Sequence, residues 1–355
     1  MRGESINAEV VLADAAGRES EAKKVVLVSP SLREANNGNW HTAHRWAKFL
    51  SGHCDIALTS HWPDPSLCAE RTQPQLMLAL HARRSSASIH AWARAYPDQP
   101  LIVVLTGTDL YRDIKTDPDA QQSLALATRL VVLQDAGLTA VPEAWRSKTS
   151  VIYQSARQLL PAARSERTFS ALMVGHLRQE KDPLIFMQAA CSDHAEGVRF
   201  VQIGDGLDPS LAEAAQATAR RTPRYRWLGG LSRAETRQHI KRAHVLVNCS
   251  EMEGGAQVIV EAIQSGTPVL ASRISGNIGM LGSDYQGYFK PGSGTGLAAL
   301  VRRCAAEPDF LALLQRQCRD RAPLFQPEQE RRLVLNLVQD ALSRPVGSGL
   351  LPHRT

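Results

Sequence analysis

Two glutamates lie eight positions apart, with a glycine turn between them that can open a helix. Glu253 precedes Gly254 and Gly255, and Glu261 falls just over one turn into the following helix. Glycine lets the backbone approach an anion, and a helix N-terminus offers free amides to phosphate, here those of Ala256, Gln257 and Val258. Glu261 can accept hydrogen bonds from ribose hydroxyls and Glu253 from sugar hydroxyls. The pattern predicts a nucleotide-sugar site; the alternative is a helix with ordinary surface glutamates.

Two basic residues follow an expected strand at 171–174. In the loop that begins at Gly175, Arg178 and Lys181 stand three positions apart. When a nucleoside diphosphate leaves, negative charge develops on phosphate oxygen, and a fixed cation lowers that barrier. We therefore expect Arg178 and Lys181 to neutralise the diphosphate, against the alternative of a solvated loop.

The sequence Ile203-Gly204-Asp205-Gly206 resembles part of a dinucleotide-binding fingerprint. Pro209 occupies the place of the third glycine, and no acidic residue follows at a suitable spacing. This argues against an NAD site. The turn either lies beside the nucleotide base or is purely structural.

Short apolar runs alternate with amphipathic stretches along the chain. Strands are expected at 25–29, 55–60, 76–81, 101–105, 130–133 and 150–153, with helices at 40–50, 86–96 and 119–127. A second series has strands at 171–174, 199–203, 225–228, 245–248 and 269–271, with helices at 183–191, 209–219, 233–242 and 257–265. Such alternation predicts an α/β fold with two Rossmann-like, doubly wound domains facing each other across a cleft, and ligands at the carboxyl ends of the strands.

The expected domain boundaries follow from these two series. Residues 1–22 are expected to be a flexible tail, 23–160 an N-terminal acceptor domain and 161–326 a C-terminal donor domain. A helix at 327–342 carries one apolar face, and we expect it to complete the first domain.

Composition sets the wider limits. The chain has 355 residues, of which 43% are hydrophobic and 21% charged, and this is enough for two cores. The formal charge of +6 is spread over scattered arginines, so no nucleic-acid stripe is indicated, and no apolar run is long enough to span a membrane. The six cysteines form no C-x-x-C pair, which favours reduced thiols and a cytoplasmic protein. No cofactor is expected, and the oligomeric state stays open.

Taken in order, the three motifs of the second half resemble the family 4 glycosyltransferases of the GT-B fold, over about 168–274. The resemblance implies that Lys181 and the amides after Glu253 hold the diphosphate and that Glu261 holds the ribose. Further donor-binding residues are expected at Gly38, His176, Arg178, Gly204 and Gly229. Two departures affect this site. His176 replaces a usual arginine, and Gly255-Ala256-Gln257 replaces a common Phe-Gly-Leu, so phosphate contacts and the sugar pocket differ from the family pattern.

The first half resembles a narrower family, the selenosugar synthases of selenoneine biosynthesis, in the segments 36–46, 79–85 and 105–113. The resemblance implies transfer of glucose or N-acetylglucosamine from its UDP derivative to selenophosphate. A carbon–selenium bond forms, and phosphate is lost later.

The residues near the end of the strand at 76–81 are of types that could bind a small anionic acceptor. His81 ends that strand, Arg83 and Arg84 follow, and Ser85 or Ser86 can cap the next helix. The expected acceptor-binding residues are His81, Arg83, Arg84, Thr106, Gly107 and Thr108. The alternative is that both arginines are ordinary surface residues.

Catalytic roles are expected for Lys181, Glu253 and His41. Selenophosphate is already anionic, so no strict general base is required, and His41 serves as a polar guide unless it is only a structural histidine. His41 and His44 have the spacing of a metal pair but no third ligand, and Asp117-Pro118-Asp119 is better explained as a loop or a helix cap, so no metal site is expected.

Two rival functions remain at this point. One is a conventional O-glycosyltransferase with a hydroxyl acceptor, and the other is an inert nucleotide-sugar sensor.

Overall fold

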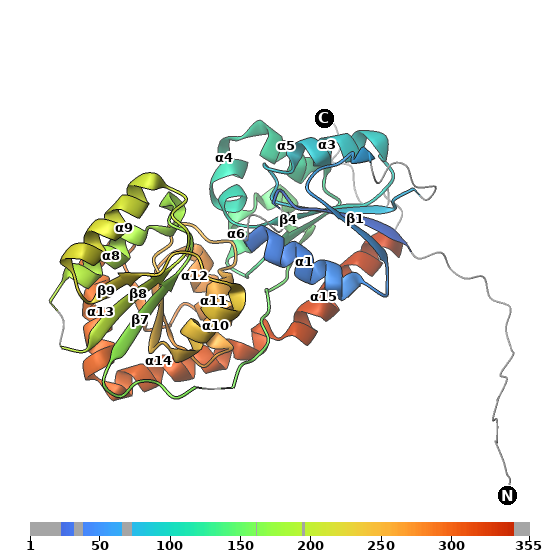
Figure 1. The fold of residues 1–355 in the computed structure, drawn as a ribbon. Coiled ribbons are helices and arrows are strands. Elements are labelled where there is room, and N and C mark those ends of the chain that lie inside the picture. The colour runs from blue at the N-terminus through green and yellow to red at the C-terminus, as the bar shows by residue number, and fades with distance from the viewer. Residues whose placement is uncertain (1–22, 32–37, 66–72, 161, 194–195, 344–355) are drawn as a thin grey trace, which may run out of the picture.

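The computed structural model describes residues 23–31, 38–65, 73–160, 162–193 and 196–343. Each half of this chain contains one sheet of parallel strands, with helices on both faces, and the two sheets form separate lobes (Figure 1). The expected tail at 1–22 and Cys68 lie outside the described residues.

The first sheet is six-stranded, in the order β2-β1-β3-β4-β5-β6. Its strands are β1 (Lys24–Val28), β2 (Asp55–Thr59), β3 (Leu76–Leu80), β4 (Leu101–Leu105), β5 (Arg129–Val132) and β6 (Thr149–Val151). Every residue of β1, β3 and β4 is buried, as expected for parallel strands covered on both faces. The helices are α1 (Gly38–Leu50), α3 (Ser86–Ala95), α4 (Ile114–Thr116), α5 (Pro118–Leu126), α6 (Gly137–Ala140) and α7 (Glu143–Arg146), with one π-helical turn, η2 (Asp109–Asp113).

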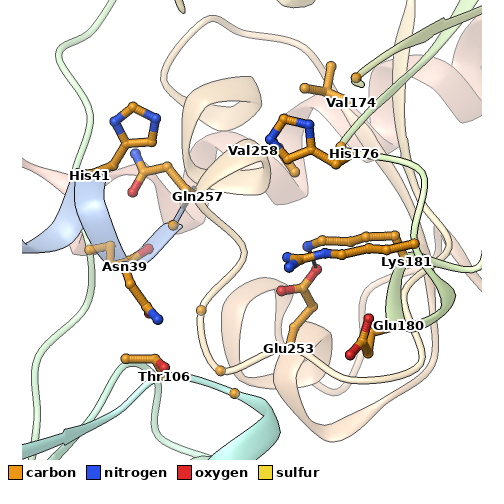
Figure 2. A pocket seen from close by; sticks show the side chains of 18 of the residues that line it. Asn39, His41, Thr106, Val174, His176, Glu180, Lys181, Glu253, Gln257 and Val258 are labelled. Atoms are coloured by element: carbon orange, nitrogen blue, oxygen red, sulfur yellow. Dashed lines mark hydrogen bonds and ion pairs between the residues drawn. The ribbon is translucent and has the colours of Figure 1, made fainter. Parts of the chain in front are cut away.

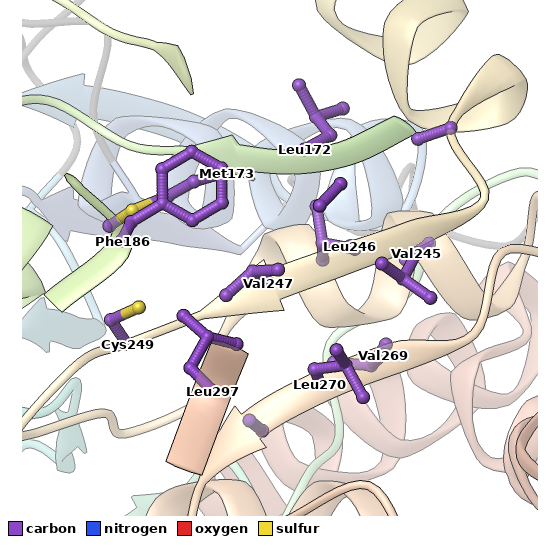
Figure 3. Close-up of a cluster of buried hydrophobic side chains, with 14 of the residues drawn as sticks. Leu172, Met173, Phe186, Val245, Leu246, Val247, Cys249, Val269, Leu270 and Leu297 are labelled. Atoms are coloured by element: carbon purple, nitrogen blue, oxygen red, sulfur yellow. The ribbon is translucent and has the colours of Figure 1, made fainter. Parts of the chain in front are cut away.

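The second sheet has the order β12-β11-β10-β7-β8-β9. Its strands are β7 (Phe169–Val174), β8 (Val198–Ile203), β9 (Tyr225–Trp227), β10 (Val245–Asn248), β11 (Val269–Ser272) and β12 (Tyr288–Phe289). The helices are η3 (Gln179–Lys181), α8 (Pro183–Cys191), α9 (Pro209–Arg221), α10 (Arg233–Arg242), α11 (Gln257–Ile263), α12 (Ser275–Leu281), α13 (Gly294–Ala306), α14 (Pro308–Arg321) and η4 (Ala322–Phe325). Aliphatic side chains of β7, β10 and β11 meet Phe186 and Leu297 in its core (Figure 3).

The last helix, α15 (Pro327–Ser343), packs on the first sheet beside α1 (Figure 1). Its buried Glu330 accepts hydrogen bonds from Arg45 Nε at 2.8 Å, from the Trp46 indole at 2.7 Å and from the Ser155 backbone at 2.8 Å. These bonds satisfy a carboxylate that would be costly to bury alone. The helix therefore crosses from the second lobe back to the first, although the domain boundaries themselves stay a prediction.

The predicted fold class is confirmed, and the expected strands differ from the observed ones only at their ends. Of the two explanations for Asp117, a loop or a helix cap, the structure shows the cap: the side chain accepts a hydrogen bond from the Ala120 amide at 3.0 Å at the start of α5. The prediction that Ser85 or Ser86 caps α3 is wrong. The Ser85 hydroxyl instead donates to the Leu80 carbonyl at 2.7 Å, and no side-chain cap forms. The two-residue β12 was not anticipated, since it is too short to show alternation.

Within the described part of the chain, no helix is both long and apolar enough to cross a membrane. The described cysteines are free thiols: Cys54, Cys191, Cys249, Cys304 and Cys318.

Candidate functional site

A cavity of about 250 Å³ lies between the carboxyl ends of the two sheets, and residues from both halves line it (Figure 2). Sixteen of the predicted site residues line this cavity: Gly38, His41, His81, Arg84, Thr106, Gly107, Thr108, His176, Arg178, Lys181, Gly204, Glu253, Gly255, Gln257, Val258 and Glu261. Gly229, Ala256 and Arg83 do not line it.

Glu253 is a buried acid of the cavity, with 8% of its surface exposed. Its Oε1 atom accepts hydrogen bonds from Lys181 Nζ at 2.5 Å, Ser250 Oγ at 2.7 Å and Asn248 Nδ2 at 3.4 Å. Burial alone would raise the pKa of Glu253, but the Lys181 charge and these hydrogen bonds outweigh it and hold the pKa below its usual value. Glu253 is therefore a fixed anion that faces Lys181 (Figure 2).

Arg178 lies beside Lys181 on the same wall but has a different environment. Among the described residues, no carboxylate or carbonyl pairs with the Arg178 guanidinium, and its Nε atom is buried without a hydrogen-bond acceptor. A buried donor without an acceptor is costly unless a ligand supplies one. The structure therefore leaves a cation available on this wall.

Two glycines allow backbones to come together at the cavity. A Cβ atom on Gly204, at φ +146°, would collide with the Gly175 carbonyl oxygen after β7. A Cβ atom on Gly254 would collide with the Thr106 carbonyl oxygen after β4, so the walls of the two halves touch there. Only glycine permits this close approach.

Glu261 meets a residue that sequence reasoning missed, Arg233 at the start of α10. The guanidinium donates to Glu261 Oε1 from Nε at 3.2 Å and from Nη2 at 3.1 Å, and Arg233 also lines the cavity. A cation in the first turn of a helix is unfavourable to the helix dipole, and this is the signal that could have drawn attention to it.

On the opposite wall, His81 follows β3 with φ 71°, a left-handed conformation that is uncommon for a residue other than glycine. Its Nδ1 atom accepts a hydrogen bond from the Arg84 amide at 3.2 Å, and its Nε2 atom lies 3.0 Å from Thr108 Oγ1. Burial lowers the pKa of His81, despite the nearby Asp109 carboxylate, and favours the neutral ring.

The two adjacent arginines have separate environments. Arg83 donates from Nε to Asp117 Oδ2 at 2.8 Å, with half of its side chain exposed, and it does not line the cavity. Arg84 lines the cavity, and no partner binds its guanidinium within the described residues. The expectation that Arg83 binds the acceptor is therefore not supported, because its charge is already paired on the outer surface.

His41 comes from α1 and lies across the cavity from Lys181 (Figure 2). Burial, with smaller contributions from Arg233, Arg45 and His44, lowers the pKa of His41 to about 4. The imidazole is therefore neutral at physiological pH. No group of three or more His, Cys, Asp or Glu residues with the geometry of a metal site occurs in the described segments.

The fold and the cavity place this chain in the GT-B class. Solved structures with the same arrangement include HepE from Anabaena in complex with UDP and glucose, with a TM-score of 0.73 and 16% identity over 90% of this chain and 100% of that chain. Sucrose-phosphate synthase from Thermosynechococcus elongatus has a TM-score of 0.71 and 15% identity over 90% and 98% of the two chains. The pneumococcal O-GlcNAc transferase GtfA, in complex with UDP and GlcNAc, has a TM-score of 0.62 and 17% identity over 76% and 57%.

The family comparison is narrower than the fold comparison. Residues 161–322 match the family described as "Glycosyl transferases group 1". This part of the chain, which contains Lys181, Glu253 and Glu261, is therefore similar to a group 1 glycosyltransferase domain.

Proposed function

We propose that this protein transfers a hexosyl group from UDP-N-acetylglucosamine or UDP-glucose to selenophosphate and so makes a 1-selenosugar. A selenium lone pair forms the bond to the anomeric carbon. The bond from that carbon to the UDP oxygen breaks, and its electron pair stays on the diphosphate. Water later cleaves the selenium–phosphorus bond of the product and releases phosphate.

The observation that carries the proposal is a pair of cations on opposite walls of one cavity that no described residue pairs. Arg178 comes from the half that matches the group 1 family and Arg84 from the other half. Two anions, a leaving diphosphate and an acceptor phosphate, would satisfy both charges. A neutral hydroxyl acceptor would leave the exposed Arg84 paired only with solvent.

UDP as the nucleotide is supported by the complexes of similar fold, since HepE was solved with UDP-glucose and GtfA with UDP and GlcNAc. In our proposal Glu261 accepts hydrogen bonds from the ribose hydroxyls after Arg233 yields its position. Lys181 and Arg178 stabilise charge on the departing diphosphate, while Glu253 orients Lys181 and meets the sugar hydroxyls. The backbone around Gly38, Gly204 and Gly255 completes the donor contacts.

A small acceptor is supported by the closeness of the two walls. The loop after β4 touches Gly254, and a Cβ atom on Gly255 would lie 2.8 Å from Leu133 Cβ after β5. Little room is left for a glycan or lipid beside the donor phosphates. Selenophosphate is small and already anionic, so the neutral His41 needs to act only as a polar guide.

The domain roles follow from the same arrangement. We propose that residues 23–160, with α15, form the acceptor domain and that 161–326 form the donor domain. We also propose a cytoplasmic location, because the free thiols and the UDP-sugar substrate both suit that compartment.

An acceptor panel tests the proposal. UDP release from each donor is measured with selenophosphate, thiophosphate, phosphate and a set of simple glycosides. The proposal expects release that depends on selenophosphate, with thiophosphate as a weaker substitute. Release that depends only on a hydroxyl acceptor would favour the O-glycosyltransferase, and binding without release would favour the sensor.

A further inference from the structure

One fully buried carboxylate, that of Asp109, joins two loops of the first half. Its Oδ1 atom accepts hydrogen bonds from the Thr106 amide at 2.9 Å and the Gly107 amide at 2.8 Å, and its Oδ2 atom accepts one from the Ala82 amide at 2.9 Å. The first two amides follow β4 and the third follows β3. Three amide donors compensate a buried charge well, so both loops are held at one point.

Those two loops carry the predicted acceptor residues. The loop after β3 supplies His81 and Arg84, and the loop after β4 supplies Thr106, Gly107 and Thr108. Asp109 itself does not line the cavity, because it lies behind these residues at the start of η2. It can affect a ligand only through the residues that it holds.

The hydrogen bonds also determine the direction of the Thr108 hydroxyl. Because the Arg84 amide donates to His81 Nδ1, the single proton of the neutral ring sits on Nε2 and is donated to Thr108 Oγ1. The Thr108 hydroxyl then has its own proton left to donate, and no described residue accepts it. It lies at the cavity, which Arg84 also lines.

We propose that Asp109 is a positioning residue that holds His81 and Thr108 so that the Thr108 hydroxyl and Arg84 present donors to an oxyanion of the acceptor. The inference rests on the proposed function for the acceptor's identity. It adds that the Thr108 hydroxyl and Arg84 both present donors, so this part of the wall favours oxyanions of the phosphate type.

The test uses the full chain and the conservative variant Asp109→Asn. An amide cannot accept from both loops, because its NH₂ group would face one of the backbone donors. Asp113→Asn is the matched control, since Asp113 is also buried in η2 but pairs with Arg112 Nε at 3.0 Å and contacts neither loop amide. Thr108→Val removes the proposed donor, and Thr108→Ser should restore it.

Two readouts separate this inference from the proposed function. The first is binding of thiophosphate to the UDP-loaded protein by calorimetry, which needs no turnover. The second is the KM for selenophosphate alongside the KM for the UDP-sugar.

Asp109→Asn and Thr108→Val should each weaken thiophosphate binding about tenfold, the effect of one lost hydrogen bond to a charged group. UDP binding and Asp113→Asn should stay near wild type. Because both residues act on one contact, the double variant should lose little more than either single variant.

The inference is overturned if thiophosphate does not bind the UDP-loaded wild type. It is also overturned if Asp109→Asn binds it normally, or if donor and acceptor affinity fall together. If the variants weaken thiophosphate binding as expected but no selenophosphate turnover is found, the proposed function is contradicted and the role of Asp109 stays supported.

Discussion

Replacing Lys181 by methionine should change the protonation state of Glu253. The Glu253 side chain is ionised in the wild type and should be protonated in the variant. Glu253 keeps its charge although it is buried, with only 8% of its surface exposed, because Lys181 Nζ lies 2.5 Å from its Oε1 atom. Methionine is unbranched like lysine, is one atom shorter and removes the charge. The remaining hydrogen bonds from Ser250 and Asn248 do not replace a full charge.

Removing one partner of a buried ion pair costs about 3–5 kcal/mol of the free energy of unfolding. Protonation of Glu253 limits that cost, and it also makes the loss of stability depend on pH. In the wild type the folded pKa of Glu253 is lowered, so stability is lost only as the pH falls below the usual carboxyl range. In Lys181→Met burial raises the pKa, so stability falls as the pH rises, by up to about 1.4 kcal/mol per pH unit.

Urea unfolding at pH 5, 6, 7 and 8 measures this directly. Wild type should differ little over this range, while Lys181→Met should lose stability as the pH rises until the raised pKa of Glu253 is passed. The double variant Lys181→Met/Glu253→Gln should recover stability and lose the slope, but should remain inactive. Equal pH profiles for wild type and Lys181→Met would refute the view that Lys181 holds Glu253 in its ionised form.

Four further substitutions test separate parts of the cavity. Glu261→Gln should weaken UDP binding about tenfold by calorimetry, since a neutral amide accepts ribose hydroxyls less strongly. Arg84→Ala should raise the KM for the acceptor about tenfold or more, while Arg83→Ala should leave it near wild type, because only Arg84 lines the cavity. Gly254→Ala should lower kcat at least tenfold, since the added methyl group would collide with the Thr106 carbonyl oxygen and force the walls apart.

Each of these predictions has an outcome that contradicts it. Unchanged UDP affinity in Glu261→Gln would remove the ribose role. Equal effects of the two arginine substitutions on acceptor KM would show that position at the cavity does not decide their roles. Wild-type kinetics for Gly254→Ala would show that the two walls need not touch during the reaction.

The sequence was sufficient for the features that local patterns encode. Continuous apolar runs such as 101–105 marked parallel strands, and the spacing from Glu253 to Glu261 marked a glycine turn followed by a helix. Because the carboxyl ends of parallel strands meet at one edge, placing these motifs after strands already brought them into one cavity.

Contacts between distant segments could not be predicted from the sequence. Nothing near Arg233 shows that it meets Glu261, since that contact depends on how α10 packs beside α11. Arg83 and Arg84 are chemically alike, and only the path of the backbone after His81 sends one outward and the other to the cavity. Asp109 lies in the segment 105–113, which carries part of the resemblance given above. Its hydrogen bond to the Ala82 amide, however, joins loops that come together only in the folded sheet.

The central claim is the formation of a carbon–selenium bond, and isotopic labelling tests it most directly. The protein is incubated with UDP-N-acetylglucosamine or UDP-glucose carrying ¹³C at the anomeric carbon, together with ⁷⁷Se-labelled selenophosphate. The product is then examined by mass spectrometry and NMR. The account predicts a selenium-containing hexose with one-bond coupling between ¹³C and ⁷⁷Se and equimolar UDP. A sugar joined through oxygen, or UDP with free hexose alone, would contradict it.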